Sequence, residues 1–286
     1  MILVVGSTGF LGSAVTRRLL GMGKQVRILV RSSSKYQELV DAGAHAVVGD
    51  LKNPDSLVAA CKGVNAVVTT ANSALRGGED TVASVDLLGN RFLIDAAKQA
   101  GVLHFSFVTG LGTDVNSPVP LLAAKAKTEA HLRSSGLEYT VLACNMFMDV
   151  WAGMAVGLPA AQGKPVTLVG EGTRKHSLVA LDDVAAFTAK SVDHPAGRNQ
   201  YVAIGGPEAL SWHDVIAAYE RVLGRTLKVE WIAPGQAVPG LPGPMSQLLA
   251  GMETYESPVD MTETAKTWGI ALTSIETFIR NSAAVK

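Results

Sequence analysis

A glycine-rich turn near the amino terminus constrains the fold of this chain more than any other feature. The apolar run from Met1 to Val5 leads into Gly6-Ser7-Thr8-Gly9-Phe10-Leu11-Gly12, which opens an amphipathic helical pattern. The first glycine permits a sharp turn, the second lets a ligand approach the backbone, and the third lets the helix lie close to the strand. Free N–H groups and the helix dipole then attract an anion. The turn predicts a dinucleotide site, and an ordinary strand-to-helix turn is the plain alternative.

The second predicted strand indicates which dinucleotide is bound. Gln25 to Val30 has the composition of a buried strand, and Arg31 and Ser32 follow it where NAD-binding folds carry an acidic residue for the ribose 2′-hydroxyl. A guanidinium can hold a 2′-phosphate through two hydrogen bonds, whereas an acidic residue would repel it. The sequence therefore predicts NADP(H) in preference to NAD(H), without excluding NAD(H). A solvated arginine at a strand end is the alternative for Arg31.

Strand and helix patterns alternate along the first half of the chain. Strands are predicted near 2–5, 25–30, 45–49, 65–70, 103–109 and 138–143, and helices near 10–21, 54–61, 82–100 and 122–135. This order predicts an α/β fold with a doubly wound parallel-sheet Rossmann core. We expect an NAD(P)-binding Rossmann domain over 1–150. A smaller C-terminal α/β substrate lobe, interleaved with the core, is expected over 151–286.

The pattern changes after residue 150. We predict a strand at 166–169, a helix over 182–192, a strand at 200–204, a helix opened by a capping box at 211–214, a loop over 234–244, and short helices over 260–268 and 273–281. Met245, Leu248, Leu249 and Met252 have helical spacing, which favours core packing, with a flexible lid as the alternative. Asp182 and Asp183 are expected to cap a helix rather than to act as an acid pair.

Composition and charge exclude several classes of partner. The 286 residues are 48% hydrophobic and carry a formal net charge of zero at pH 7, and no long basic run is present. We therefore expect neither nucleic acid nor a membrane as partner, but a small apolar or aromatic substrate. Only Cys61 and Cys144 are cysteines, and the first strand begins at Met1, so a cytoplasmic monomer or homodimer is expected. No spacing typical of a metal site occurs, and His176 is expected to be structural.

Short-chain dehydrogenases use a tyrosine four residues before a lysine, and none of the five tyrosines here has that spacing. Other segments nevertheless carry a family resemblance. They are Gly49-Asp50-Leu51, Leu93-Ile94-Asp95-Ala96-Ala97-Lys98, Ser135-Gly136-Leu137 and Asn145-Met146-Phe147-Met148. With the glycine turn, they resemble the atypical short-chain dehydrogenases of the NmrA-like family. That family includes isoflavone-reductase-type, quinone and triphenylmethane reductases as well as non-enzymatic redox regulators and photosystem assembly factors.

The resemblance implies roles for individual residues. Lys125 falls on the family's lysine and is the predicted catalytic residue, either as a proton donor or only as a contact to the cofactor. A solvated position on a helix face is its plain alternative. Leu121 stands where the tyrosine would be, and Thr109-Gly110 stands where many relatives have two serines. A dedicated acid is therefore missing.

The remaining predicted cofactor contacts lie at strand ends. Asp50 and Leu51 are expected at the adenine edge, and Asn145 and Phe147 beside the nicotinamide, with plain core packing as the alternative for Phe147. Strand ends at the switch point of the sheet, where such ligands lie, supply the others. These are Thr70, Ala71, Asn72 and Thr109.

Two functions are consistent with these residues. The first is an NADPH-dependent reductase that transfers hydride to a planar, apolar, conjugated acceptor such as a quinone or enone. Such an acceptor spreads its charge after reduction, so it needs a dedicated acid less than a simple ketone does. The second is a non-catalytic NADP-binding redox sensor, regulator or assembly factor. The fold by itself does not separate them.

Overall fold

The computed structural model describes residues 1–74, 76–241 and 243–282, and the chain divides into two compact units. The N-terminal unit comprises Met1–Cys144 and Val184–Ala203, and the C-terminal unit comprises Asn145–Asp183 and Ile204–Lys286. The chain passes from the N-terminal to the C-terminal unit after Cys144, returns at Val184 and passes to the C-terminal unit again after Ala203.

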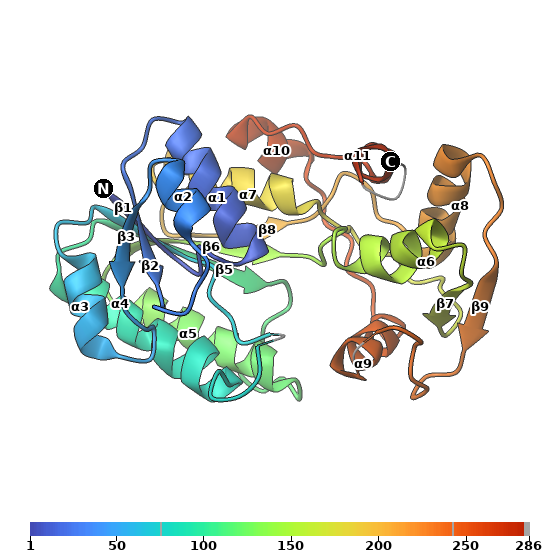
Figure 1. Ribbon diagram of the computed structural model, residues 1–286, viewed down its shortest axis with the longest axis horizontal. Helices are drawn as coiled ribbons and strands as arrows, with labels where there is room; N and C mark the ends of the chain where they lie inside the picture. Colours follow the sequence, from blue (N-terminus) through green and yellow to red (C-terminus); the bar gives the residue numbers. More distant parts are fainter. Residues whose placement is uncertain (75, 242, 283–286) are drawn as a thin grey trace. The chain divides into compact units, whose positions relative to one another are not determined.

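The N-terminal unit is built on a sheet of seven strands within the described residues, in the order β3-β2-β1-β4-β5-β6-β8 (Figure 1). The strands are β1 (Ile2–Val5), β2 (Val26–Val30), β3 (His45–Val48), β4 (Ala66–Thr69), β5 (His104–Gly110), β6 (Glu138–Cys144) and β8 (Gln200–Ile204). The pairs from β3 through β6 are parallel. The order reverses between β1 and β4, so the predicted doubly wound sheet is confirmed and its switch point lies there.

Helices cover both faces of this sheet (Figure 1). One face carries α1 (Phe10–Gly21), α2 (Gln37–Asp41) and the part of α7 (Leu181–Lys190) that belongs to this unit; the other carries α3 (Pro54–Cys61), the π-helix η1 (Val82–Gly89), α4 (Asn90–Gln99) and α5 (Pro120–Ser134). Successive residues of β1 point to opposite faces. Val4 packs with Leu19 in one buried cluster, and Leu3 packs with Leu93 in the other.

The local sequence explains where several helices begin. Asn53 accepts hydrogen bonds from the backbone N–H groups of Asp55 and Ser56, and Pro54 occupies the first helical position of α3, as predicted. The predicted helix over 82–100 is instead a π-helix followed by an α-helix. A π-helical stretch places an extra residue in the turn, and such turns are frequent at functional sites. The short helix α2 was not predicted.

The C-terminal unit has a core of its own. Its elements are η2 (Ala152–Gly157), α6 (Leu158–Ala161), β7 (Val166–Val169), α8 (Trp212–Leu223), β9 (Val229–Ile232), α9 (Gly243–Met252), α10 (Thr262–Trp268) and α11 (Ile275–Asn281). Strands β7 and β9 pair in parallel, and β9 was not predicted. Met245, Leu249 and Met252 are buried in the core, as expected for packing residues, whereas Leu248 is exposed.

Two predicted boundaries of this unit need correction. The predicted loop over 234–244 ends earlier, because α9 begins at Gly243; Pro242 lies outside the described residues. The last helix is capped by Ser274, which accepts from the N–H of Thr277, and not by Thr273. Thr273 instead donates its N–H and hydroxyl to the Asp183 carboxylate, at 2.7 and 2.9 Å. The capping box at Ser211 and Asp214 is confirmed. No helix among the described residues has the length and apolar character needed to span a bilayer.

Candidate functional site

The glycine turn between β1 and α1 combines positions that packing requires with one that it does not. Gly6 has φ +86°, and a Cβ on Gly12 would lie 2.1 Å from the carbonyl oxygen of Gly6, so the fold itself demands both glycines. Gly9 has an ordinary φ of −81°, and the nearest described atom to a Cβ there is Gly6 O at 3.4 Å. The described residues therefore leave room for a Cβ at Gly9, and a glycine there is expected where a ligand approaches the backbone.

Buried polar atoms without partners lie along the carboxyl edge of the same sheet. Among the described residues of the N-terminal unit these atoms are Ser7 Oγ, just after β1, Thr109 Oγ1, near the end of β5, and Asp86 Oδ1, in η1. A buried polar atom without a hydrogen bond costs about 1–3 kcal/mol, so it is rare unless water or a ligand pairs with it. These atoms and the open space at Gly9 fit a polar ligand lying across this edge.

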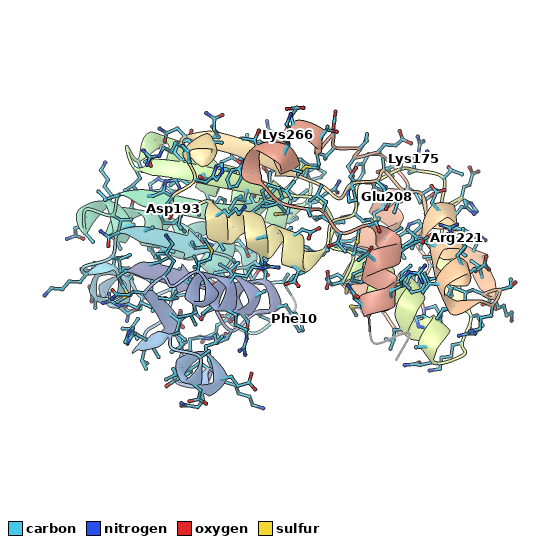
Figure 2. All side chains as sticks on the ribbon, turned by 90° about the horizontal axis from the view of Figure 1, so that it is seen from above. Phe10, Lys175, Asp193, Glu208, Arg221 and Lys266 are labelled. Carbon is cyan, nitrogen blue, oxygen red and sulfur yellow. The ribbon has the colours of Figure 1, made fainter. Side chains whose placement is uncertain are left out.

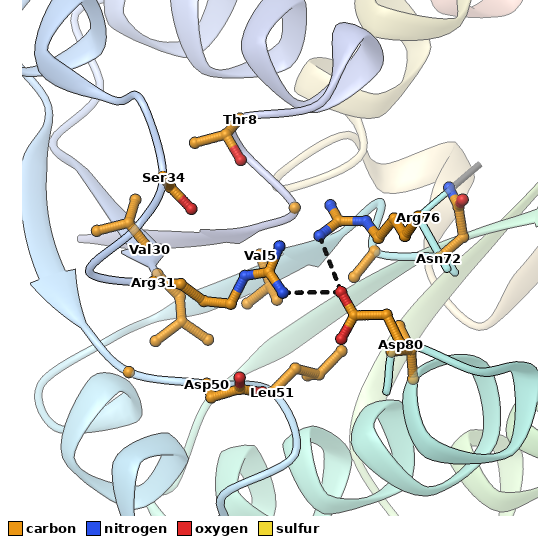
Figure 3. Close-up of a pocket in the computed structure, with 15 residues that line it drawn as sticks. Val5, Thr8, Val30, Arg31, Ser34, Asp50, Leu51, Asn72, Arg76 and Asp80 are labelled. Atoms are coloured by element: carbon orange, nitrogen blue, oxygen red, sulfur yellow. Dashed lines mark hydrogen bonds and ion pairs between the residues drawn. The ribbon is translucent and has the colours of Figure 1, made fainter. Parts of the chain in front are cut away.

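A pocket opens at the ends of β1, β2 and β4 (Figure 3). Of the predicted cofactor contacts it is lined by Gly6, Thr8, Arg31, Asp50, Leu51, Ala71 and Asn72. Ser34, Arg76, Asp80 and Val85 also line it and were not predicted. Ser32 is not among the lining residues. The switch-point residue Thr70 turns its hydroxyl toward the carbonyl oxygens of Val5 and Gly6, each at 3.4 Å, next to the glycine turn.

Arg31 is not simply a solvated arginine at a strand end. Its Nη1 donates to Asp80 Oδ2 at 2.7 Å, and the side chain is partly buried in the pocket (Figure 3). Lys52 and Arg76 approach the same carboxylate. The sequence carries a faint signal for this cluster in the charged turn Arg76-Gly77-Gly78-Glu79-Asp80, which follows the strand that ends at the switch point.

Two other predicted residues lie at the start of α1. Phe10 is 89% exposed at the first position of the helix (Figure 2). Leu11 is partly buried and packs against the cluster that contains Leu19. An apolar ring left this exposed beside a glycine turn is available to cover a ligand bound there.

Lys125, on α5, is buried rather than solvated. Its Nζ lies 3.7 Å from Asp86 Oδ1, donates to the carbonyl oxygen of Val108 at 3.5 Å, and sits 5.4 Å from the centre of the Phe107 ring. Burial lowers the pKa of Lys125, and the Asp86 charge opposes that shift. Burial raises the pKa of the nearby Cys144 thiol to about 12, so that thiol is neutral. The site therefore contains one ammonium whose proton is easier to lose than that of a surface lysine.

Asp86, which was not predicted, is held firmly in this site. One carboxylate oxygen accepts from the backbone N–H of Ser73 at 3.0 Å and from its hydroxyl at 2.6 Å, and Thr128 donates to the Asp86 carbonyl oxygen at 2.8 Å. The side chain is fully buried. A lone acidic residue within the apolar run Val82 to Leu88 was the only sequence signal for it.

Asn145 and Phe147 belong to the C-terminal unit. The Asn145 amide donates to the carbonyl oxygen of Ser257 at 2.7 Å, and its Oδ1 lies 3.1 Å from the Ser257 hydroxyl. That hydroxyl lies 2.8 Å from Nδ1 of His176, whose Nε2 lies 3.1 Å from the Met252 carbonyl oxygen. His176 is buried with a partner at each ring nitrogen, as a structural histidine is. A contact of Asn145 and Phe147 with the nicotinamide stays a prediction.

The sequence matches a known protein family over nearly the whole chain. The model of the NmrA-like family matches residues 1–281. The chain belongs to the NmrA-like family. The glycine turn, the switch point and the helix that carries Lys125 therefore all lie within the part of the chain that defines this family.

Proteins with sequences similar to this chain include an assembly factor and an enzyme. The photosystem II assembly factor Ycf39 of Cyanophora paradoxa is 36% identical, over 80% of this chain and 70% of that protein. The NAD(P)H azoreductase of Xenophilus azovorans is 33% identical, over 91% of this chain and 84% of that protein. Proteins named as an assembly factor and as an enzyme are thus similarly distant from this chain.

Solved structures share the fold over nearly the whole chain. The NADPH-dependent quinone oxidoreductase QOR2 of Escherichia coli, in complex with NADPH, has a TM-score of 0.82 at 23% identity and covers 98% of this chain and 99% of its own. The triphenylmethane reductase of Citrobacter sp., in complex with NADP(H), has a TM-score of 0.83 at 20% identity with coverage of 98% and 99%. At these identities the likeness establishes the fold alone.

Proposed function

We propose that this NmrA-like protein is an NADPH-dependent reductase of a planar, apolar, conjugated acceptor such as a quinone, an enone or an azo compound. The bound dinucleotide supplies hydride. The observation that carries the proposal is the buried Lys125 ammonium beside Asp86, at a sheet edge where polar atoms lack partners. A site with no ligand gains nothing from leaving those atoms unpaired.

The pocket residues divide the binding of the dinucleotide among them. The N–H groups of the turn from Gly6 to Gly12 receive the pyrophosphate at the positive end of α1. Arg31 receives the 2′-phosphate, and Asp50 and Leu51 receive the adenine. Ser32, which does not line the pocket, stays a prediction as a second contact to that phosphate. The names of the relatives support this assignment, since the azoreductase uses NAD(P)H and the two solved reductases were obtained with NADPH or NADP(H).

Lys125 is the group of this site that can hold and release a proton. Burial makes its ammonium a better acid than an exposed lysine, and Asp86 keeps it charged and fixed in place. Leu121 stands where related dehydrogenases have a tyrosine, so proton delivery falls to Lys125 or water. That supply is sufficient for a conjugated acceptor, whose charge is spread over several atoms. A role of the C-terminal unit as substrate lobe stays a prediction.

Measuring NADPH oxidation with a panel of quinones, enones and azo dyes tests the proposal. We expect turnover with at least one class of acceptor. In the Gly9→Val variant we expect binding of NADPH and of NADH to be lost. Circular dichroism and the unfolding midpoint should stay near those of the parent, because a Cβ at Gly9 meets no described atom closer than 3.4 Å. The matched variant Gly12→Ala should lose the fold itself. Parental cofactor affinity in a folded Gly9→Val variant would contradict the site.

The relationship to Ycf39 supports a second candidate function. That assembly factor is 36% identical to this chain, slightly more than the azoreductase. In this alternative the protein binds NADP(H) without turnover and acts as a redox sensor or assembly factor. Tight NADPH binding with no oxidation by any acceptor of the panel would favour it over the reductase.

A further inference from the structure

Three basic side chains, those of Arg31, Lys52 and Arg76, meet at the carboxylate of Asp80. Figure 3 shows two of them, Arg31 and Arg76. Arg31 Nη1 lies 2.7 Å from Oδ2, Lys52 Nζ lies 2.9 Å from Oδ1, and Arg76 Nη1 lies 3.7 Å from Oδ2. Burial raises the pKa of Asp80, but hydrogen bonds from Lys52 and Arg31 outweigh it and hold that pKa below its ordinary value. Asp80 is thus a charged carboxylate enclosed by cations.

This geometry is that of an anion site filled by a side chain of the protein. The Asp80 side chain is only 10% exposed, whereas those of Arg31, Arg76 and Lys52 are 40%, 32% and 27% exposed. A carboxylate offers one negative charge and two oxygens, whereas a phosphate monoester offers nearly two charges and three oxygens. Guanidinium and ammonium groups bind phosphate at least as readily as carboxylate. A phosphate would therefore satisfy this cluster better than Asp80 does.

Asp80 ends an exposed turn that contains two glycines. Gly77 and Gly78 have φ values of +75° and +63°, and a Cβ on either would meet no described atom within 4 Å. The backbone N–H of Asp80 donates to the Gly77 carbonyl oxygen at 3.3 Å, so the turn closes on itself.

We propose that Asp80 sets the cofactor preference of this protein by competing with the 2′-phosphate of NADP(H) for Arg31, Lys52 and Arg76. The inference rests on the proposed dinucleotide site. In the free protein the carboxylate pairs with the cations and offsets part of their charge, and the 2′-phosphate displaces it on binding. A dinucleotide without that phosphate leaves the carboxylate in place. The preference for NADP(H) is then smaller than the three cations alone would produce.

Binding of two adenosine phosphates measures this competition without turnover. Adenosine 2′,5′-bisphosphate carries the 2′-phosphate, and 5′-AMP lacks it. By titration calorimetry at fixed ionic strength, we expect Asp80→Asn to bind the bisphosphate about tenfold more tightly than the parent, because a competing charge-assisted bond is gone. Binding of 5′-AMP should change less than twofold. The matched control is Glu79→Gln on the same turn: the Glu79 carboxylate lies 3.9 Å from Lys52 Nζ but is 97% exposed, so water screens it, and both affinities should change less than twofold.

The outcomes separate this inference from the proposed function. Weaker or unchanged bisphosphate binding in Asp80→Asn, and in Asp80→Ala as a second folded variant, would overturn the competition and make Asp80 a support for the cations. The proposed dinucleotide site would stand in that case if the parent bound the bisphosphate and Arg31→Ala weakened it. Failure of the parent and all variants to bind either nucleotide would overturn both.

Discussion

Each unit of this protein buries a cluster of polar side chains, and the two clusters are satisfied to different degrees. In the N-terminal unit Lys125 Nζ lies 3.7 Å from Asp86 Oδ1, which is an ion pair, and that oxygen has no hydrogen-bond partner among the described residues. In the C-terminal unit the two ring nitrogens of His176 lie 2.8 and 3.1 Å from the Ser257 hydroxyl and the Met252 carbonyl oxygen.

Under the proposed function, this contrast separates Lys125, which takes part in chemistry, from His176, which supports the structure. An interior polar network that is fully paired fixes the fold around it. A buried pair with unmet hydrogen-bonding capacity costs stability and persists only where something else uses it. Burial lowers the pKa of both Lys125 and His176, so the direction of the pKa shift does not distinguish the two residues. They differ in whether their polar partners are fully hydrogen-bonded.

The largest expected effect is on turnover in Lys125→Met. At saturating NADPH we expect turnover to fall about 10²–10⁴-fold, the usual contribution of a general acid, while the dissociation constant for NADPH rises much less. The control is Lys127→Met, which removes an exposed lysine of the same helix and should leave turnover intact. A loss confined to binding would make Lys125 a clamp for the cofactor. Unchanged binding and turnover would remove it from the site.

The second prediction concerns the paired cluster. His176→Leu leaves the Ser257 hydroxyl and the Met252 carbonyl oxygen without their partner, so we expect the free energy of unfolding to fall by about 1–3 kcal/mol. The NADPH dissociation constant should not change. Chemical denaturation measures the first and fluorescence titration the second, with the exposed His213→Leu as control. If His176→Leu kept the parental stability but lost turnover, His176 would have a functional role and not the structural one expected here.

Asp86→Asn should have a smaller effect, on the pH dependence of turnover. The Asp86 charge raises the pKa of Lys125 against the lowering by burial, so its removal lets that pKa fall further. If protonated Lys125 is required, the alkaline limb of the turnover profile should move to lower pH, with a loss of turnover at a fixed pH on that limb. The variant Lys125→Met/Asp86→Asn, which removes both charges, should have no such limb. An unmoved limb in Asp86→Asn would exclude Lys125 as the titrating group.

The smallest effect is on stability in mild acid. Burial lowers the pKa of His176 in the fold, although Glu253 and Glu256 oppose the shift, so the unfolded chain binds its proton first as the pH falls. Stability from this residue is therefore present above its ordinary pKa of about 6.5 and declines below it, by at most about 1.4 kcal/mol per pH unit. Buried His104 acts in the same direction. The difference between parent and His176→Leu isolates the His176 share, and identical pH dependences would contradict it.

The sequence predicted the features that local signals encode. A strand, a glycine turn and a helix must be contiguous, so the residues from Met1 to Gly21 and their packing against the sheet could be inferred directly. Asn53 with Pro54 and Ser211 with Asp214 likewise carry their helix starts in a few neighbouring residues. Strand β9 was missed although its apolar and polar residues have the same order as those of β7, because four residues give too short a pattern to identify a strand without its pairing partner.

The sequence by itself determined the parallel sheet, its switch point and the glycine turn, because these depend on hydrophobic periodicity and on backbone freedom at single positions. Only the tertiary structure decided which charges meet. Arg31 and Asp80 are 49 residues apart, and His176 and Ser257 are 81 residues apart. No local pattern encodes such a pair, because side-chain electrostatics act through space and depend on which strands and helices become neighbours. The same physics left Lys125 buried beside Asp86, a charge that the sequence shows only as one acidic residue in an apolar run.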